Sequence, residues 1–306
     1  MSSPVQTQVK LGRLSLQNPV IAASGTFGYG WEFEGYLDLN GLGGIVTKGI
    51  SLGPRPGNRP PRTWETACGM LNAIGLANVG LEAFLKEKLP FLAGLDAKVI
   101  VNLYAETLED FTALAAALEG VPGVDALELN VSCPNVKKGG LAFGQDPGAV
   151  GEVTAAVRRQ TSLPLWVKLT PNVSDPTPMA RAAADSGADA ISLINTILGM
   201  AIDARSRRPR LGNLYGGLSG PAIKPVGLRM VHQVSQAVPL PVVGMGGIMC
   251  GEDAAEYLLA GARAVQVGTA NFVDPQACLR VARELEEFLA EQGIADVNEL
   301  VGALQA

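Results

Sequence analysis

The sequence contains a single histidine, His232, and four cysteines that lie far apart along the chain. A two-histidine metal site and a serine–histidine–aspartate triad are therefore not expected, and any proton transfer must use another residue type. Because no C-x-x-C pair exists, the usual signatures of zinc and iron–sulfur sites are absent from the sequence, and we predict no bound metal. Four cysteines in 306 residues do not indicate a disulfide scaffold, so we expect reduced thiols and a cytoplasmic location.

Aromatic residues make up only 5% of the sequence and charged residues 17%. The net charge of −5 argues against a nucleic-acid-binding protein, which would show a basic stripe. No apolar run approaches the ~18–20 residues of a membrane helix, and the first residues lack the apolar core of a secretory signal. The hydrophobic fraction of 47% instead predicts a folded chain with a large core.

Short runs rich in Val, Ile and Leu alternate with helix-length segments. Such runs, bounded by Gly or Pro, are typical of strands buried on both faces of a parallel sheet. We predict strands at 18–25, 44–50, 98–104, 126–132, 163–170, 188–196, 241–248 and 264–270. We predict helices at 81–92, 108–118, 147–160, 176–186, 224–238 and 254–260, and a closing helix that includes 284–292.

Eight strand–helix alternations predict an α/β protein with a (β/α)8 TIM-barrel fold; a doubly wound sheet is the alternative. The length suits one barrel domain over residues 1–306. Two connections, 51–80 and 197–223, are unusually long. Since long insertions in a barrel usually belong to its functional face, we expect both at the carboxyl-terminal end of the strands.

Polar residues recur where the predicted strands end, which is where barrel enzymes place their active sites. Six ends carry Ser24, Lys48, Asn102, Asn130, Lys168 and the pair Asn195–Thr196. Each one alone could be a satisfied structural residue. Because buried Lys and Asn are costly without partners, the whole set indicates a binding site.

Strands seven and eight end in Gly246–Gly247 and Gly268–Thr269. These glycines suit tight turns, or they let backbone N–H groups approach a phosphate, which many barrels bind at this position. A phosphate-bearing cofactor lying across this end of the barrel would account for both the glycines and the ring of amides.

The segment Asn130–Asn135, NVSCPN, is the most specific local signal. A lone cysteine is usually a small buried apolar residue, which is how we interpret Cys68, Cys250 and Cys278. Cys133 follows a strand-end Asn and precedes a Pro, so we place it at the barrel opening. A nearby cation or dipole could lower the pKa of its thiol from about 8.5. We interpret Cys133 as a general base on a lid, not as a metal ligand.

Taken in order, the motifs resemble those of dihydroorotate dehydrogenases, flavoproteins of de novo pyrimidine (UMP) biosynthesis. The resemblance covers essentially the whole chain and rests on ASGTFGYG, VTKGI, PRPGNRPPR, GMLNAIGL, LNVSCPN, VKLTPN, INT followed by GMAID, GGLSGPAI, GMGGI and QVGTA. The cysteine of SCPN is typical of class 1. NVSCPNVKKGGLAFG and VTKGI look more like class 1B, the NAD-linked type, than class 1A, the fumarate-linked type.

The resemblance implies FMN as the cofactor and oxidation of dihydroorotate to orotate as the reaction. Cys133 would take a proton from carbon 5 while carbon 6 delivers hydride to flavin nitrogen 5, with Lys48 between flavin and substrate. It implies substrate binding by Lys48, Asn72, Ala73, Ile74, Gly75, Leu76, Asn130, Asn195 and Thr196. It implies FMN binding by Ser24, Lys48, Gly49, Asn102, Asn130, Lys168, Ile194, Gly220, Gly246, Gly247, Gly268 and Thr269.

Three positions depart from the pattern of the relatives. Ala77 stands where many have Gln, Val79 where Pro is common, and Tyr104 where small residues are usual. None of the three removes a catalytic group that the resemblance implies. They concern fine substrate contacts and packing beside the flavin.

In class 1B enzymes, electrons leave FMN through a second subunit that carries FAD and a 2Fe-2S cluster. This chain has neither cysteine spacing for the cluster nor a G-x-G-x-x-G after a strand. The resemblance therefore implies that NAD chemistry belongs to a partner, around a homodimer core or in a heterotetramer.

Other functions stay open at this point. A class 1A-like enzyme using fumarate and a related dihydropyrimidine oxidoreductase are the nearest alternatives. A subunit that holds flavin only as a scaffold is the non-enzyme alternative. A flavin-free lyase using Lys48 or Lys168 as a Schiff base would leave the Cys-Pro-Asn loop without a role.

Overall fold

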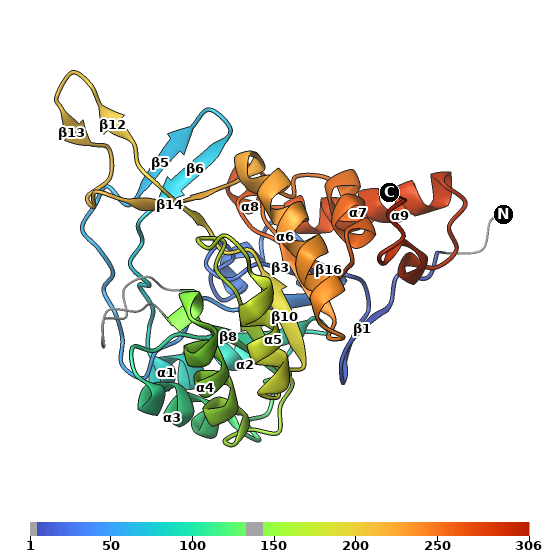
Figure 1. The fold of residues 1–306 in the computed structure, drawn as a ribbon, viewed down its shortest axis with the longest axis horizontal. Helices are drawn as coiled ribbons and strands as arrows, with labels where there is room; N and C mark the ends of the chain where they lie inside the picture. The colour runs from blue at the N-terminus through green and yellow to red at the C-terminus, as the bar shows by residue number, and fades with distance from the viewer. Residues whose placement is uncertain (1–4, 133–142, 306) are drawn as a thin grey trace.

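The computed structural model describes residues 5–132 and 143–305 of the chain. Eight parallel strands close into a barrel, hydrogen-bonded in the order β10–β15–β16–β3–β4–β7–β8–β9 (Figure 1). They are β3 (Val20–Ala22), β4 (Gly44–Val46), β7 (Lys98–Leu103), β8 (Ala126–Asn130), β9 (Leu165–Lys168), β10 (Ala190–Leu193), β15 (Val242–Met245) and β16 (Ala262–Val267). Each corresponds to one predicted strand, so the TIM-barrel prediction is confirmed and the doubly wound alternative is wrong.

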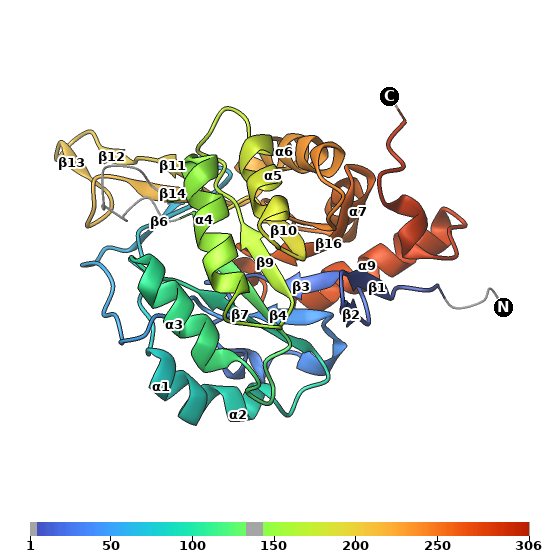
Figure 2. The same ribbon diagram turned by 60° about the horizontal axis from the view of Figure 1, so that its bottom comes forward.

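Helices surround the strands, as Figure 2 shows. They are α1 (Leu81–Ala83), α2 (Leu89–Leu92), α3 (Leu108–Leu118), α4 (Pro147–Arg158), α5 (Thr177–Asp185), α6 (Lys224–Ala237), α7 (Gly251–Leu259), α8 (Ala270–Val273) and α9 (Ala277–Glu291). A π-helical turn, Phe84–Lys88, joins α1 to α2. Short 3-10 turns lie at Trp31–Phe33, Leu39–Gly41, Phe143–Gln145, Pro221–Ile223 and Val297–Leu300.

Helix α3 illustrates why these segments form where they do. The Thr107 hydroxyl accepts a hydrogen bond from the Asp110 backbone N–H at 3.1 Å and caps the first turn. Phe111, Leu114 and Leu118 then recur at helical spacing and are buried in the core. A polar cap followed by an apolar stripe therefore fixes both the start of α3 and the face it turns inward.

The two long connections form one additional sheet. Its strands are β5 (Thr63–Thr66), β6 (Gly69–Asn72), β11 (Ile197–Gly199) and β14 (Gly216–Ser219), in the antiparallel order β11–β14–β6–β5. A small hairpin of β12 (Ile202–Asp203) and β13 (Arg208–Pro209) extends it. Figures 1 and 2 show this part projecting on the side away from both chain ends. The connections leave the carboxyl ends of β4 and β10, as predicted.

The opposite end of the barrel is covered by the hairpin of β1 (Val9–Leu11) and β2 (Leu14–Leu16). Its turn approaches the start of β10, where Arg13 lies 3.7 Å from the carboxylate of Asp189. Gly12 makes the turn with a φ of 61°. The amino-terminal end is therefore covered by the chain itself.

Among the described residues, none of the helices has the length and apolar character needed to cross a membrane.

Candidate active site

Closure of the barrel brings the strand-end residues to one end of the molecule. Ser24 and Lys48 lie two residues past β3 and β4, Asn102 lies in β7, and Asn130 and Lys168 end β8 and β9. Ile194 and Asn195 follow β10, Gly246–Gly247 follow β15, and Gly268–Thr269 follow β16. Because all eight strands are parallel, their carboxyl ends surround one region of the molecule.

The ends of β8 and β9 are fixed against each other. Asn130 and Lys168 are register partners in the parallel pair. Beyond them, the Ser132 hydroxyl donates to the Lys168 carbonyl oxygen at 2.9 Å, and the Ser132 N–H donates to Asn130 Oδ1 at 3.2 Å. The chain that leads to Cys133 is thus anchored. Cys133 itself lies outside the described residues, so its predicted role stays a prediction.

A buried carboxylate that the sequence analysis missed lies inside the barrel. Glu128 has an exposed fraction of 0% and accepts hydrogen bonds from Asn102 Nδ2 at 2.7 Å, Ser192 Oγ at 2.8 Å and Gln266 Nε2 at 2.8 Å. Lys168 Nζ lies 3.8 Å from its Oε1. These partners come from strands that are not all neighbours of β8, so Glu128 must point inward. The sequence does carry a signal for this residue, because Glu128 is the one charged residue in the otherwise apolar start of β8, ALEL.

Lys48 lies at the end of β4 in a half-buried position, where its backbone N–H donates to the Gly28 carbonyl oxygen at 2.9 Å. Burial lowers the pKa of its ammonium; Arg62 adds to this effect, and the charge of Glu32 opposes it. In the described part of the chain, no carboxylate lies within ion-pair distance of this ammonium. It can therefore pair with an anionic ligand.

The additional sheet brings Asn72 to the end of β10. Asn72 in β6 is opposite Gly217 in β14 and donates from Nδ2 to the Gly217 carbonyl oxygen at 3.3 Å. A side chain at Gly217 would overlap Thr196, so Gly217 lies between the two predicted substrate-binding residues. Asn172 holds this region by donating to the Thr196 carbonyl oxygen at 3.1 Å.

The predicted substrate loop after β6 has a defined path. Asn58 donates its backbone N–H to the Ile74 carbonyl oxygen and its Nδ2 to the Ala73 carbonyl oxygen, both at 3.0 Å. A side chain at Gly75, where φ is 74°, would come within 2.5 Å of Asn58. Leu76 has the uncommon φ of 57°. The loop is thus held by Asn58, an earlier residue of the same inserted segment.

The glycine turn after β15 is packed too closely for any other residue. Gly247 has a φ of 74°, and a side chain there would approach the Gly220 carbonyl oxygen to 2.8 Å. The Tyr257 hydroxyl donates to the Gly246 carbonyl oxygen at 2.7 Å. Burial raises the pKa of Tyr257 far above its ordinary value, so this hydroxyl remains a donor.

Gly268 differs from Gly247, because an added Cβ would meet nothing closer than 3.6 Å in the chain. The described residues therefore leave enough space for a larger residue at position 268. A second feature also points outside the chain: Asn102 Oδ1 is buried and has no hydrogen-bond partner among the described residues. Both features suit a ligand that approaches Gly268 closely and offers an N–H donor.

Of the three departures from the family pattern, Tyr104 is the most constrained. It is buried, its hydroxyl donates to Glu106 Oε1 at 3.1 Å, and the Arg55 guanidinium lies 5.1 Å from the ring centre. Glu106 and Arg55 thus hold the Tyr104 side chain in place.

The interpretation of the other three cysteines as buried apolar residues holds for only one of them. Cys278 is buried, and burial raises the pKa of its thiol to about 12. Cys250 is half-buried. Cys68 is exposed, so the interpretation is wrong for it: it occupies the β5–β6 turn of the projecting sheet. All three are free thiols.

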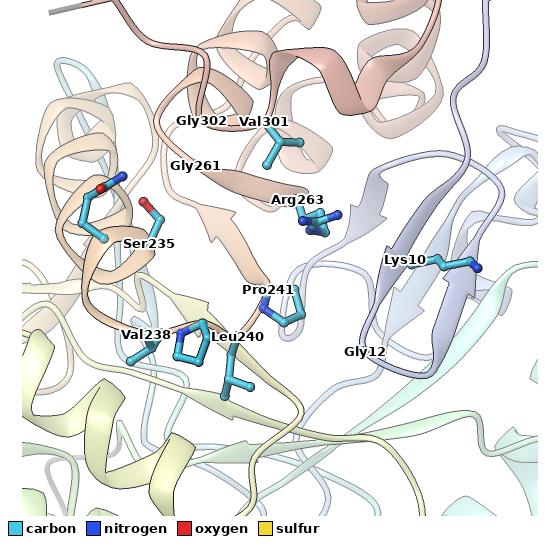
Figure 3. Close-up of a pocket in the computed structure, with 12 residues that line it drawn as sticks. Lys10, Gly12, Ser235, Val238, Leu240, Pro241, Gly261, Arg263, Val301 and Gly302 are labelled. Carbon is cyan, nitrogen blue, oxygen red and sulfur yellow. The ribbon is translucent and has the colours of Figure 1, made fainter.

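An open depression of about 480 Å³ lies at the opposite end of the barrel (Figure 3). Its lining includes Leu240 and Pro241 just before β15, Gly261 just before β16, and Lys10 of the β1–β2 hairpin. None of the predicted site residues borders it. Because barrel enzymes act at the carboxyl-terminal end, we assign no catalytic role to this depression.

Comparison with known proteins identifies the family. The family model described as dihydroorotate dehydrogenase matches residues 6–289. The chain is 60% identical over 297 residues to the dihydroorotate dehydrogenase B (NAD(+)) catalytic subunit of Geotalea daltonii, which covers 97% of each protein. It is 60% identical over 296 residues to that of Geotalea uraniireducens and 58% identical over 297 residues to that of Geobacter sulfurreducens, each again over 97% of both proteins. The chain therefore belongs to the dihydroorotate dehydrogenase family, and its similarity is to the class 1B catalytic subunits.

Proposed function

We propose that this chain is an FMN-dependent enzyme that oxidises dihydroorotate to orotate. The observation that carries the proposal is the set of groups at the carboxyl end of the barrel. Lys48 and Lys168 supply cations there, Asn102 offers a buried acceptor without a partner, and Gly268 leaves space that the chain does not need. The family membership gives this arrangement its chemistry.

The residues present fit FMN. An isoalloxazine ring offers an N–H donor to an acceptor such as Asn102 Oδ1, and a phosphate suits the close backbone approach at Gly247 and Gly268. We propose that FMN is held by Ser24, Lys48, Gly49, Asn102, Asn130, Lys168, Ile194, Gly220, Gly246, Gly247, Gly268 and Thr269.

When bound, FMN supplies a hydride acceptor for carbon 6 of dihydroorotate. The chain's own residues supply the remaining functions. We propose that Cys133 takes the proton from carbon 5 and that the fixed charge of Lys168 favours negative charge on the cofactor. Lys48 would lie between cofactor and substrate.

For substrate binding, we propose that side-chain amides face the flat amide edges of the pyrimidine, since an Asn amide both donates and accepts. The proposed set is Lys48, Asn72, Ala73, Ile74, Gly75, Leu76, Asn130, Asn195 and Thr196. The Asn72–Gly217 hydrogen bond and the position of Thr196 beside Gly217 support this assignment, because they bring two separate insertions to one strand end.

We propose that electrons pass to NAD through a partner subunit that carries FAD and a 2Fe-2S cluster, around a homodimer core or in a heterotetramer. Exposed Leu198, Ile202 and Tyr215 on the inserted segment between β10 and β14 support association with another protein chain. We further propose that residues 1–306 form one domain and that the enzyme works in the cytoplasm, where free thiols persist.

The experiment that tests the function begins with identification of the cofactor released from purified protein, followed by turnover assays. We expect FMN and dihydroorotate oxidation with an artificial acceptor, and no oxidation of dihydrouracil. Fumarate-dependent turnover by this chain alone would favour the class 1A alternative. Protein that holds no flavin, or that traps substrate on a lysine with borohydride, would refute the proposal.

A further inference from the structure

The buried Glu128–Lys168 pair is not explained by stability. Barrel interiors are normally filled by branched apolar side chains, and a buried ion pair is often no more stable than an apolar replacement of similar volume. The exposed fractions of the Lys168 and Glu128 side chains are 7% and 0%. Two buried charges therefore require another explanation. Lys168 belongs to the proposed FMN-binding set, and Glu128 is hydrogen-bonded to Asn102 of the same set.

We propose that Glu128 is a positioning residue that sets the orientation of Asn102 and Lys168 toward FMN. The inference rests on the proposed function and deepens it, because it assigns a role to a residue that does not itself touch the cofactor.

The orientation of the Asn102 amide follows from the charge of Glu128. A carboxylate only accepts hydrogen bonds, so Asn102 must turn Nδ2 toward it, as the 2.7 Å distance shows. Oδ1 is then left facing the end of β4, where a Cβ on Gly49 would meet it at 2.9 Å. The buried acceptor without a partner is thus a consequence of Glu128.

The distance between Lys168 and Glu128 leaves the lysine available. At 3.8 Å, Nζ is attracted to Oε1 but lies beyond hydrogen-bond distance. Ser192 and Gln266 occupy the other carboxylate oxygen, Oε2, at 2.8 Å each, so the carboxylate is held in place independently of the lysine. Lys168 is therefore directed by charge, and within residues 5–132 and 143–305 its Nζ makes no hydrogen bond that would keep it from an acceptor outside this network.

Glu128 also sets the net charge beneath the cofactor. With both groups ionised, the pair sums to zero. Replacing the acid by a neutral group leaves the cation of Lys168 uncompensated, which favours the anionic reduced flavin.

The test compares Glu128→Gln with wild-type protein and with a matched control, Thr154→Val. Thr154 is equally buried, but its hydroxyl donates to Val150 within α4, outside the barrel. Two quantities are measured: the FMN dissociation constant of the apoprotein and the flavin midpoint potential. We expect E128Q to weaken FMN binding by about tenfold, because the charge-assisted hydrogen bond that orients Asn102 is lost. We also expect the flavin potential to shift to more positive values, because the charge of Lys168 is no longer compensated. Thr154→Val should change neither quantity.

A Lys168→Met background separates positioning from a structural role. If Glu128 acts partly through Lys168, E128Q should weaken FMN binding less in this background than in wild-type protein, because only the orientation of Asn102 is still lost. An equal loss in both backgrounds with an unchanged potential would overturn the inference. Should E128Q fail to fold, Glu128→Asp, which withdraws the carboxylate by one methylene, must weaken FMN binding; unchanged binding would overturn it.

The two proposals fail differently. Wild-type protein that binds no FMN refutes the proposed function and, with it, this inference. Wild-type protein that binds FMN and is reduced by dihydroorotate, while E128Q matches it in affinity and potential, refutes the inference alone.

Discussion

The Tyr257 hydroxyl joins the outer helices to the glycine turn of the proposed cofactor site. Tyr257 lies in α7 with an exposed fraction of 0%, and its hydroxyl lies 2.7 Å from the Gly246 carbonyl oxygen and 3.3 Å from that of Met245. A side chain at Gly227 would overlap this hydroxyl, so the oxygen occupies a closely packed position. Tyr257→Phe removes this atom and preserves the ring.

The expected cost follows from the contacts. The phenyl ring still fills the site, so the cavity term is small. The Gly246 carbonyl oxygen loses its donor in a partly buried place, which costs about 1 kcal/mol. Because Gly246–Gly247 would lie against the FMN phosphate, the same change should also weaken FMN binding.

Urea unfolding of the apoprotein at neutral pH measures the first effect, and titration with FMN measures the second. Tyr36→Phe is the matched control, since Tyr36 is 60% exposed. The reasoning is refuted if Y257F and Y36F have the same unfolding free energy and the same FMN affinity as wild-type protein.

Three further predictions concern other parts of the molecule. Hydrogen bonds from Ser162 and Thr161 lower the pKa of Glu119 from 4.5 to about 2, so Glu119→Gln should reduce stability at pH 7, with a difference that shrinks as pH falls below 4.5 in urea titrations. Gly268→Ala should leave apoprotein stability unchanged yet weaken FMN binding, because its Cβ has space in the chain; a destabilised apoprotein would contradict this. Cys133→Ala should retain FMN but slow its reduction by dihydroorotate about 10²–10⁴-fold, and unchanged stopped-flow rates would reject Cys133 as the base.

The barrel could be predicted because each of its strands is buried on both faces and reads as a short apolar run. The boundaries were less predictable. Strand β16 begins at Ala262, two residues before the predicted start, because the exposed Arg263 interrupts the apolar run although its backbone continues the strand. Sequence periodicity does not distinguish such a residue from a turn.

The additional sheet could not be predicted strand by strand. Strand β14 reads GGLS and pairs with β6, which lies far away in the sequence. Glycine is unfavourable in strands, so local propensity argued for a loop. The pairing depends on two insertions meeting at one end of the barrel, which only the closed fold brings about.

The candidate active site was likewise predictable only in part. Strand-end residues such as Lys48 and Lys168 could be located, because strand direction alone places them. Glu128 was inside a predicted strand, yet its role depends on the side chain pointing inward to partners such as Gln266 across the barrel. The strand register and the closure of the barrel bring Glu128 and Gln266 together, and the amino-acid composition does not reveal this contact.

The most direct test of the central claim is anaerobic mixing of purified, FMN-loaded protein with dihydroorotate while the absorbance of oxidised flavin is followed. The account predicts that the yellow colour is lost in a single turnover and that orotate forms in equal amount to the flavin reduced. Flavin that dithionite bleaches but dihydroorotate leaves oxidised would contradict it.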